Sequence, residues 1–203
     1  MEANAGGNKM VNWEQLENLC SSCTRCGLCQ TRNNTVFDGG SRNAKIMLVG
    51  EGPGRQEDLQ GKVFVGPAGQ LLDKMLASIK LTRDDVYISN VVKCRPPQNR
   101  DPRPAERVSC LPSLRAQLVL VKPKIIVCLG RVAAQAIIKP DFRITTEHGI
   151  WTERAGYFMT ATYHPAALLR YPDNKRAAYE DLLKIREKLD SFEQETDKTD
   201  SID

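Results

Sequence analysis

Closely spaced cysteines are the first residues in this sequence whose types and spacing predict chemistry. The chain of 203 residues has seven cysteines, and four of them follow one another at intervals of three residues. These four are Cys20, Cys23, Cys26 and Cys29. Such a run is typical of a cubane iron–sulfur cluster held by one loop, and a tetrahedral zinc site is the second interpretation. Cys128 lies in an apolar segment, so we predict it to be a core residue.

A glycine-rich turn with acidic and aromatic residues behind it predicts a ligand site. The segment Gly50-Glu51-Gly52-Pro53-Gly54 follows an apolar run, and Glu57 and Phe64 come shortly after it. Its glycines permit a ligand to approach the backbone closely. The spacing excludes two phosphate-binding motifs, because a Walker loop would need Gly at position 56 and a dinucleotide fingerprint would need Gly at position 55.

Three apolar segments are predicted to be the strands that position these residues. The strands span residues 46–49, 86–92 and 124–129; helices begin near residues 67, 104 and 131, short strands and turns occupy 143–162, and a last helix spans 173–192. Pro112 is expected to kink or break the second helix. Strands that alternate with helices predict a parallel α/β sheet covered on both faces. Ligands of such folds bind outside the carboxyl ends of the strands, where the glycine-rich turn falls.

Length and composition predict one domain in the cytoplasm. We expect residues 1–11 and 193–203 to be disordered and residues 12–192 to form the domain. No apolar run approaches the ~20 residues of a membrane span, and the N-terminus lacks the apolar core of a secretion signal. The net charge of +4 is compatible with a nucleic-acid partner. Nothing in the sequence indicates an oligomer, so we expect a monomer.

Five motifs occur in one order along residues 15–190. They are GEGPG from Gly50, QED from Gln56, FVGPAGQLL from Phe64, NVVKCRPP from Asn90 and YHPAALLR from Tyr163. Together they resemble the family 4 uracil-DNA glycosylases, the iron–sulfur branch of the uracil-DNA glycosylase superfamily. The resemblance implies a single-domain, three-layer α/β/α fold with a central, mainly parallel four-stranded sheet. It also implies a monofunctional enzyme that flips uracil out of DNA and hydrolyses its N-glycosidic bond, leaving an abasic site that starts base excision repair.

The same resemblance implies roles for the residues of a uracil pocket. Phe64 is expected to stack on the flipped base, Asn90 to hydrogen-bond its edge, and His164 to stabilise the anion that forms on the leaving uracil. Gly52 stands where some branches have an Asp that positions the attacking water. We therefore expect the water to be positioned by the backbone of the glycine loop, by Glu51 or by Glu57, and we prefer Glu57.

The resemblance further implies contacts to uracil-containing DNA around the pocket. Leu168 and Leu169 are expected to fill the stack that the flipped base vacates, with Arg170 against the DNA backbone. Lys93 and Arg95 are expected to lie against phosphates. A sliding clamp is an additional partner to consider, but the sequence offers no convincing motif for one.

A [4Fe–4S] cluster is the cofactor that the resemblance implies. Its expected ligands are Cys23, Cys26, Cys94 and Cys110. Cys20 and Cys29 are then free thiols or spare ligands, and a local cluster held by the four-cysteine run stays open as the alternative. The expected role is structural, because the cluster would tie the N-terminal loop to the proline-rich loop that follows Cys94.

Two other classes of protein fit part of the pattern. One is a non-catalytic iron–sulfur protein that binds nucleic acid, and the other is a ferredoxin-like electron carrier. In a glycosylase, Asn90→Ala and His164→Ala should abolish excision of uracil but spare DNA binding. This result would distinguish the enzyme from a non-catalytic protein that binds nucleic acid. An electron carrier would be reduced reversibly and would be indifferent to DNA. A covalent link to DNA through a histidine is excluded, because the loop RPPQNRDPRPAE has none.

Overall fold

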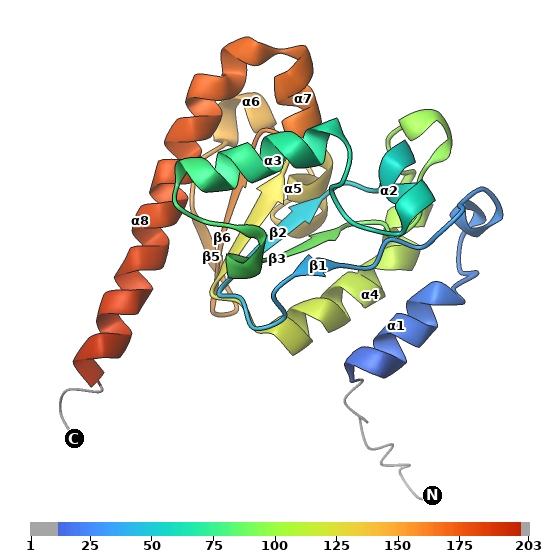
Figure 1. Cartoon of the computed structure of the whole chain (residues 1–203), viewed down its shortest axis with the longest axis horizontal. Helices are drawn as coiled ribbons and strands as arrows, with labels where there is room; N and C mark the ends of the chain where they lie inside the picture. Colours follow the sequence, from blue (N-terminus) through green and yellow to red (C-terminus); the bar gives the residue numbers. More distant parts are fainter. Residues whose placement is uncertain (1–11, 200–203) are drawn as a thin grey trace, which may run out of the picture.

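A six-stranded sheet lies at the centre of the chain, with helices on both of its faces (Figure 1). The computed structural model describes residues 12–199, so the predictions for residues 1–11 and 200–203 lie outside the described residues. The strand order is β1-β3-β2-β4-β6-β5. The strands are β1 (Gly39–Gly40), β2 (Ile46–Gly50), β3 (Val86–Asn90), β4 (Ile125–Leu129), β5 (Thr152–Arg154) and β6 (Tyr157–Thr162).

The four central strands are parallel, and the two edge strands are antiparallel to their neighbours. β3, β2, β4 and β6 form the parallel part, while β1 pairs with β3 and β5 with β6 in the opposite sense. The predicted α/β fold is confirmed, but the predicted count of four strands is corrected to six. β1 consists of two glycines and β5 of three residues, so neither has the apolar run that identifies a strand in a sequence.

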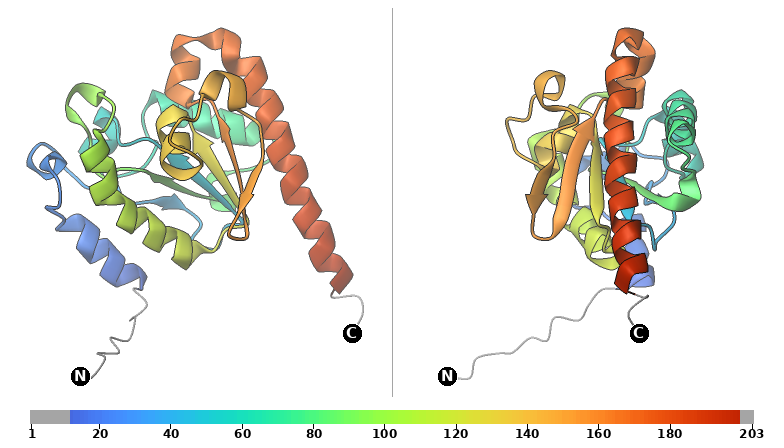
Figure 2. Two further views of the ribbon diagram at one scale, coloured as in Figure 1. Left: turned by 180° about the vertical axis from the view of Figure 1, so that it is seen from behind. Right: turned by 90° about the vertical axis from the view of Figure 1, so that its left-hand side faces the viewer.

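Every residue of β2, β3 and β4 is buried, which confirms the three predicted strands. Ile46 and Leu48 of β2 pack with apolar residues of α3, α7 and α8, whereas Met47 and Val49 pack with those of α4 and α5. Strands buried on both faces are typical of parallel sheets in α/β proteins. Figure 2 shows α3 on one side of the sheet and α4 on the other.

Eight α-helices are described between residues 12 and 199. They are α1 (Trp13–Ser21), α2 (Arg55–Gln60), α3 (Pro67–Ser78), α4 (Pro104–Val121), α5 (Arg131–Ile137), α6 (Ile144–Glu147), α7 (Pro165–Arg170) and α8 (Lys175–Thr199). Within the described residues, no helix is long and apolar enough to cross a membrane.

Two predicted helix features are wrong. α4 continues through Pro112, so the helix does not break there; the carbonyl that loses its hydrogen bond belongs to Val108, a residue that is 67% exposed. α8 extends to Thr199, beyond residue 192, where the last helix was predicted to end.

Candidate active site and cysteine cavity

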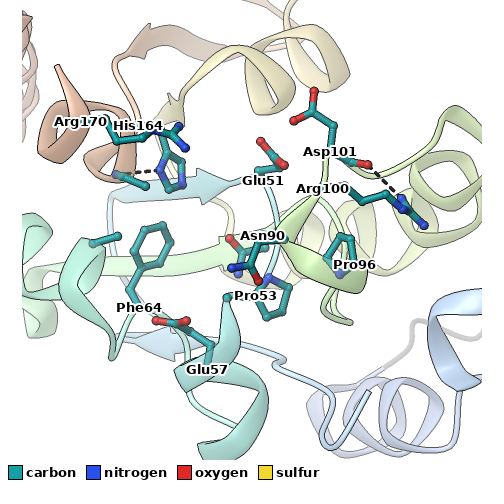
Figure 3. A pocket seen from close by; sticks show the side chains of 15 residues that line it. Glu51, Pro53, Glu57, Phe64, Asn90, Pro96, Arg100, Asp101, His164 and Arg170 are labelled. Carbon is teal, nitrogen blue, oxygen red and sulfur yellow. Dashed lines mark hydrogen bonds between the residues drawn. The ribbon is translucent and has the colours of Figure 1, made fainter. Parts of the chain in front are cut away.

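The carboxyl ends of β2, β3 and β6 open into one cleft (Figure 3). Its volume is about 320 Å³. The residues predicted for catalysis and base binding all line it, and they are Glu51, Gly52, Glu57, Phe64, Asn90 and His164. Parallel strands end at the same edge of a sheet, which is why motifs from distant parts of the chain meet here.

Asn90 presents an unpaired amide to this cleft. The residue ends β3 opposite Gly50 of β2, and it is only 2% exposed. Its side-chain Oδ1 is buried without a hydrogen-bond partner among the described residues. A Cβ added to Gly50 would lie 2.4 Å from Oδ1 and 2.8 Å from the Phe64 ring, so only glycine leaves room for both side chains. A buried polar atom without a partner indicates a site that a ligand completes.

The Phe64 ring is held beside His164 by a strained and well-anchored loop. Phe64 has φ 51°, and its ring stacks on the His164 ring at 5.7 Å between centroids. The guanidinium of Arg83 donates to the carbonyl oxygens of Val63 and Phe64. A backbone conformation that costs energy persists only where neighbouring contacts impose it. The aromatic face is therefore fixed before any ligand binds.

Glu57 anchors the same loop. Its Oε1 accepts hydrogen bonds from the backbone N–H groups of Val65, at 2.9 Å, and Gly66, at 2.8 Å. Its second oxygen, Oε2, lies against Gly54, where an added Cβ would be 2.7 Å away. One carboxylate oxygen is thus committed to holding the chain next to Phe64.

His164 is neutral, and its tautomer is fixed by the helix that it begins. The residue is the N-cap of α7, and its Nδ1 accepts a hydrogen bond from the Ala166 N–H at 3.1 Å. Since Nδ1 accepts, the proton of the neutral ring is on Nε2. Burial, with a smaller effect of the Arg170 charge, lowers the pKa of His164 to about 4. Nε2 has no partner among the described residues and can donate to a ligand.

Glu51 is the carboxylate of the cleft whose ionisation is most perturbed. Burial raises the pKa of Glu51 to about 7, and the neighbouring Asp101 carboxylate acts in the same direction. The charges of Arg131, Arg107 and Arg170 oppose the shift. No other side chain within residues 12–199 hydrogen-bonds the Glu51 carboxylate. A carboxylate with a pKa close to neutrality can bind and orient water.

Two of the residues predicted to contact DNA have buried side chains. Leu168 is 1% exposed and packs in the core, and Lys93 is 2% exposed with its ammonium bonded to the interior of the protein. Burial lowers the pKa of Lys93 to about 8. Leu169, at 49% exposed, and Arg170 lie at the surface, where contact with DNA is available. Arg95 is half-buried and donates from Nε to Asn99 at 2.7 Å.

Sequence reasoning missed a buried group that fixes the end of β6 before His164. His148 Nδ1 lies 2.9 Å from the Asp181 carboxylate, which also accepts from the Thr162 hydroxyl at 2.7 Å. The His148 ring packs on Tyr163 at 4.9 Å. No sequence signal pointed to it, since Asp181 belongs to the highly charged helix α8. Arg100 and Asp101 of the proline-rich loop also line the cleft, and no motif in the sequence assigned them to it.

A second cavity is lined by six of the seven cysteines. They are Cys20, Cys23, Cys26, Cys29, Cys94 and Cys110. Cys128 is instead fully buried in the sheet, as predicted for a core residue. Arg25 donates to Cys23 Sγ at 3.2 Å and Arg32 to Cys94 Sγ at 3.3 Å. Among the described residues, no three His, Cys, Asp or Glu side chains are drawn together tightly enough for a single metal ion.

The donors of this cavity suit an iron–sulfur cluster. A cubane cluster takes thiolates, and it separates its four ligands more widely than one zinc ion does. Hydrogen bonds to the sulfur atoms stabilise such a cluster. The four-cysteine run, with its cluster-like spacing, and the two later cysteines surround the same space.

Comparison with known proteins identifies the family. Residues 37–184 match the model of the uracil DNA glycosylase superfamily. A type-4 uracil-DNA glycosylase of Archaeoglobus fulgidus is 47% identical over 176 residues, which cover 82% of this chain and 87% of the relative. The type-4 enzyme of Thermotoga maritima is 41% identical over 87% of this chain and 96% of its own length. A type-5 uracil-DNA glycosylase of Pyrobaculum aerophilum is 36% identical over 64% of each chain. The chain therefore belongs to the uracil DNA glycosylase superfamily and, within it, to the type-4 uracil-DNA glycosylases.

Proposed function

We propose that this uracil-DNA glycosylase stabilises the leaving uracil through the Nε2 proton of His164. The observation that carries the proposal is the hydrogen bond from Ala166 N–H to Nδ1, which leaves the proton of the neutral ring on Nε2. Breaking the N-glycosidic bond places negative charge on the base, and an oriented donor stabilises that charge without proton transfer. The low pKa keeps the ring in this form at neutral pH.

Asn90 reads the edge of the flipped base. A side-chain amide offers one acceptor and one donor, so Oδ1 would accept from N3–H of uracil while Nδ2 donates to O4. Cytosine presents the reverse pattern and would leave both amide groups unpaired in a buried site. The unpaired state of Oδ1 in the structure supports this role. Phe64 supplies the stacking face, which is common to every base.

Glu51 is the group that we assign to the attacking water. Glu57 was preferred from the sequence, but its Oε1 already accepts two backbone N–H groups, whereas Glu51 has no such commitment within residues 12–199. An oxocarbenium-like sugar needs only a positioned water for capture. Gly52, beside Glu51 in the cleft, leaves the backbone accessible to the same water. Glu57 acts instead as the anchor of the Phe64 loop.

Leu169 and Arg170 form the proposed DNA-facing tip after His164. Leu169 would enter the stack vacated by uracil, because it is exposed whereas Leu168 is committed to the core. Arg170 lines the cleft and would contact the phosphate backbone beside the flipped nucleotide. No lysine lines the cleft in the described structure, which agrees with a monofunctional enzyme.

A [4Fe–4S] cluster in the cysteine cavity is the proposed cofactor. Three of its four proposed ligands receive an N–H hydrogen bond: Cys23 from Arg25, Cys94 from Arg32 and Cys110 from the backbone of Lys93. Cys20 interacts with the Ser113 hydroxyl instead. This pattern supports a ligand set that includes Cys94 and Cys110 over one made only of the four-cysteine run. When bound, the cluster would cross-link the N-terminal segment to α4; thiols need a reducing compartment such as the cytoplasm.

Incubation with a labelled uracil-containing oligonucleotide, followed by alkali, tests this function. Strand cleavage at uracil that depends on alkali is expected, because a monofunctional enzyme leaves an intact abasic site. Matched oligonucleotides with thymine or cytosine at that position should remain whole. Cleavage before alkali would contradict the monofunctional mechanism, and absence of cleavage would contradict the assignment of the cleft.

A further inference from the structure

Lys93 lies between the cysteine cavity and the uracil cleft. The two sites share none of their lining residues. Lys93 forms part of the wall of the cysteine cavity, and its backbone N–H donates to Cys110 Sγ at 3.3 Å. Its ammonium donates to the backbone carbonyl of Asn90 at 2.7 Å. Lys93 therefore lines the cysteine cavity and also contacts Asn90, the residue proposed to bind the base.

The ammonium is placed where its charge must be compensated. It is buried, and its second hydrogen bond, of 2.6 Å, goes to the neutral hydroxyl of Ser89. That hydroxyl donates in turn to Gln117 Oε1 at 2.9 Å, and Gln117 is also fully buried. A buried charge is costly unless opposite charge lies nearby. The cysteine cavity lies directly beside this residue, since Cys110 Sγ accepts from the Lys93 backbone N–H, and thiolates that hold a cluster there would supply such charge.

We propose that Lys93 is a positioning residue that couples the occupancy of the cysteine cavity to uracil recognition by Asn90. The inference rests on the proposal that the cavity holds an anionic iron–sulfur cluster. Anionic thiolates favour the buried ammonium in its present place, and a charge-assisted hydrogen bond then holds the Asn90 carbonyl. Emptying the cavity removes the compensating charge, so the ammonium shifts and the backbone of Asn90 loses its restraint.

The test compares selectivity of binding, which does not require catalysis. Fluorescence anisotropy gives Kd for an oligonucleotide with a fluorinated deoxyuridine that resists hydrolysis and for one with deoxycytidine at that position, and the ratio is the selectivity. Wild type and Lys93→Met are measured with the cluster present, as judged by its visible absorbance, and after chelation. Measurements are made where circular dichroism shows folded protein. Lys74→Met, on the exposed face of α3, is the matched control.

In wild type, chelation should lower the selectivity about tenfold, the effect of losing one charge-assisted hydrogen bond. Loaded Lys93→Met should already be about tenfold less selective, and chelation should change it by less than about twofold, because no ammonium remains to respond. Lys74→Met should behave as wild type. Wild-type selectivity in loaded Lys93→Met, or an equal effect of chelation in both proteins, would overturn the inference.

Ser89→Ala provides a second variant if Lys93→Met does not fold. It removes one of the two acceptors of the ammonium and should lower the selectivity of the loaded protein about threefold, with an enhanced response to chelation. Unchanged selectivity in Ser89→Ala would also overturn the inference. A wild-type protein that never acquires visible absorbance would instead contradict the cluster proposal, so the two failures are distinguishable.

Discussion

At the scale of single residues, the cleft combines two titrating groups with well-separated pKa values. His164 has a pKa of about 4 and Glu51 one of about 7. Above about pH 5 His164 is therefore neutral, whereas Glu51 changes its charge near neutrality. A water held by the Glu51 carboxylate requires the ionised form, which accumulates as the pH rises through 7.

This separation predicts the pH profile of excision. The single-turnover rate of wild type should rise with pH between about 5 and 8 along one ionisation centred near 7 and then level off. Glu51→Gln should be slower by about tenfold to a hundredfold at pH 8 and should lose that ionisation, because the glutamine amide does not ionise. An unchanged ionisation in Glu51→Gln would show that another group positions the water.

The Asn90 amide predicts a loss that is specific to the reading of the base. Asn90→Ala removes two hydrogen bonds to uracil, worth together about 3 kcal/mol, which corresponds to about a hundredfold in kcat/KM. Binding to DNA without uracil should be unaffected, because phosphate contacts supply it. Competition with uracil-free DNA provides this control, and equal losses for both kinds of DNA would contradict the assigned role.

At the scale of secondary structure, what the sequence predicts depends on how local the signal is. The strands at Ile46–Gly50 and Ile125–Leu129 are recognised because continuous apolar runs are typical of buried parallel strands. β1 and β5 are missed because their pairing partners, not their own side chains, make them strands. Leu168 and Lys93 belong to motifs of the cleft, yet the direction in which their side chains point depends on packing. A sequence motif does not give that direction. The hydrogen bonds by which Glu57 anchors the Phe64 loop likewise depend on the tertiary structure.

Gly50, at the end of β2, tests how closely Asn90 and Phe64 pack in the cleft. Gly50→Ala would place a Cβ within 3 Å of both Asn90 Oδ1 and the Phe64 ring, so excision should fall about a hundredfold as both side chains move. Gly27→Ala is the control, because its added Cβ would meet no atom within 4 Å. Single-turnover rates and melting temperatures of both variants check the prediction. A normal rate in Gly50→Ala would contradict the tight fit.

At the scale of the whole molecule, the cysteine cavity joins segments that lie far apart in the sequence. Cys23 and Cys26 lie beside the 3₁₀ turn Gly27–Gln30, Cys94 follows β3, and Cys110 lies on α4. A cross-link between distant segments stabilises the folded state by restricting the unfolded one. The proposed cluster would therefore have a structural role in addition to its proposed effect through Lys93.

Removal of the cluster should lower the melting temperature. By comparison with a covalent cross-link, the loss is about 3 kcal/mol, or about 6–12 °C for a chain of this size. Cys23→Ser should show the same decrease and lose visible absorbance, whereas Cys29→Ser should keep both absorbance and melting temperature. Loss of absorbance in Cys29→Ser would favour the local four-cysteine run. An unchanged melting temperature after chelation would contradict the structural role.

The most direct test of the central claim compares His164→Ala with wild type in single-turnover excision of uracil. Loss of one oriented donor should slow the chemical step by about 10²–10³-fold. Anisotropy with the fluorinated, uncleaved oligonucleotide should give a Kd within about threefold of wild type, because the donor acts on charge that forms only in the transition state. This result would locate leaving-group stabilisation at Nε2. A near-normal rate in His164→Ala, or a loss fully explained by weaker binding, would contradict it.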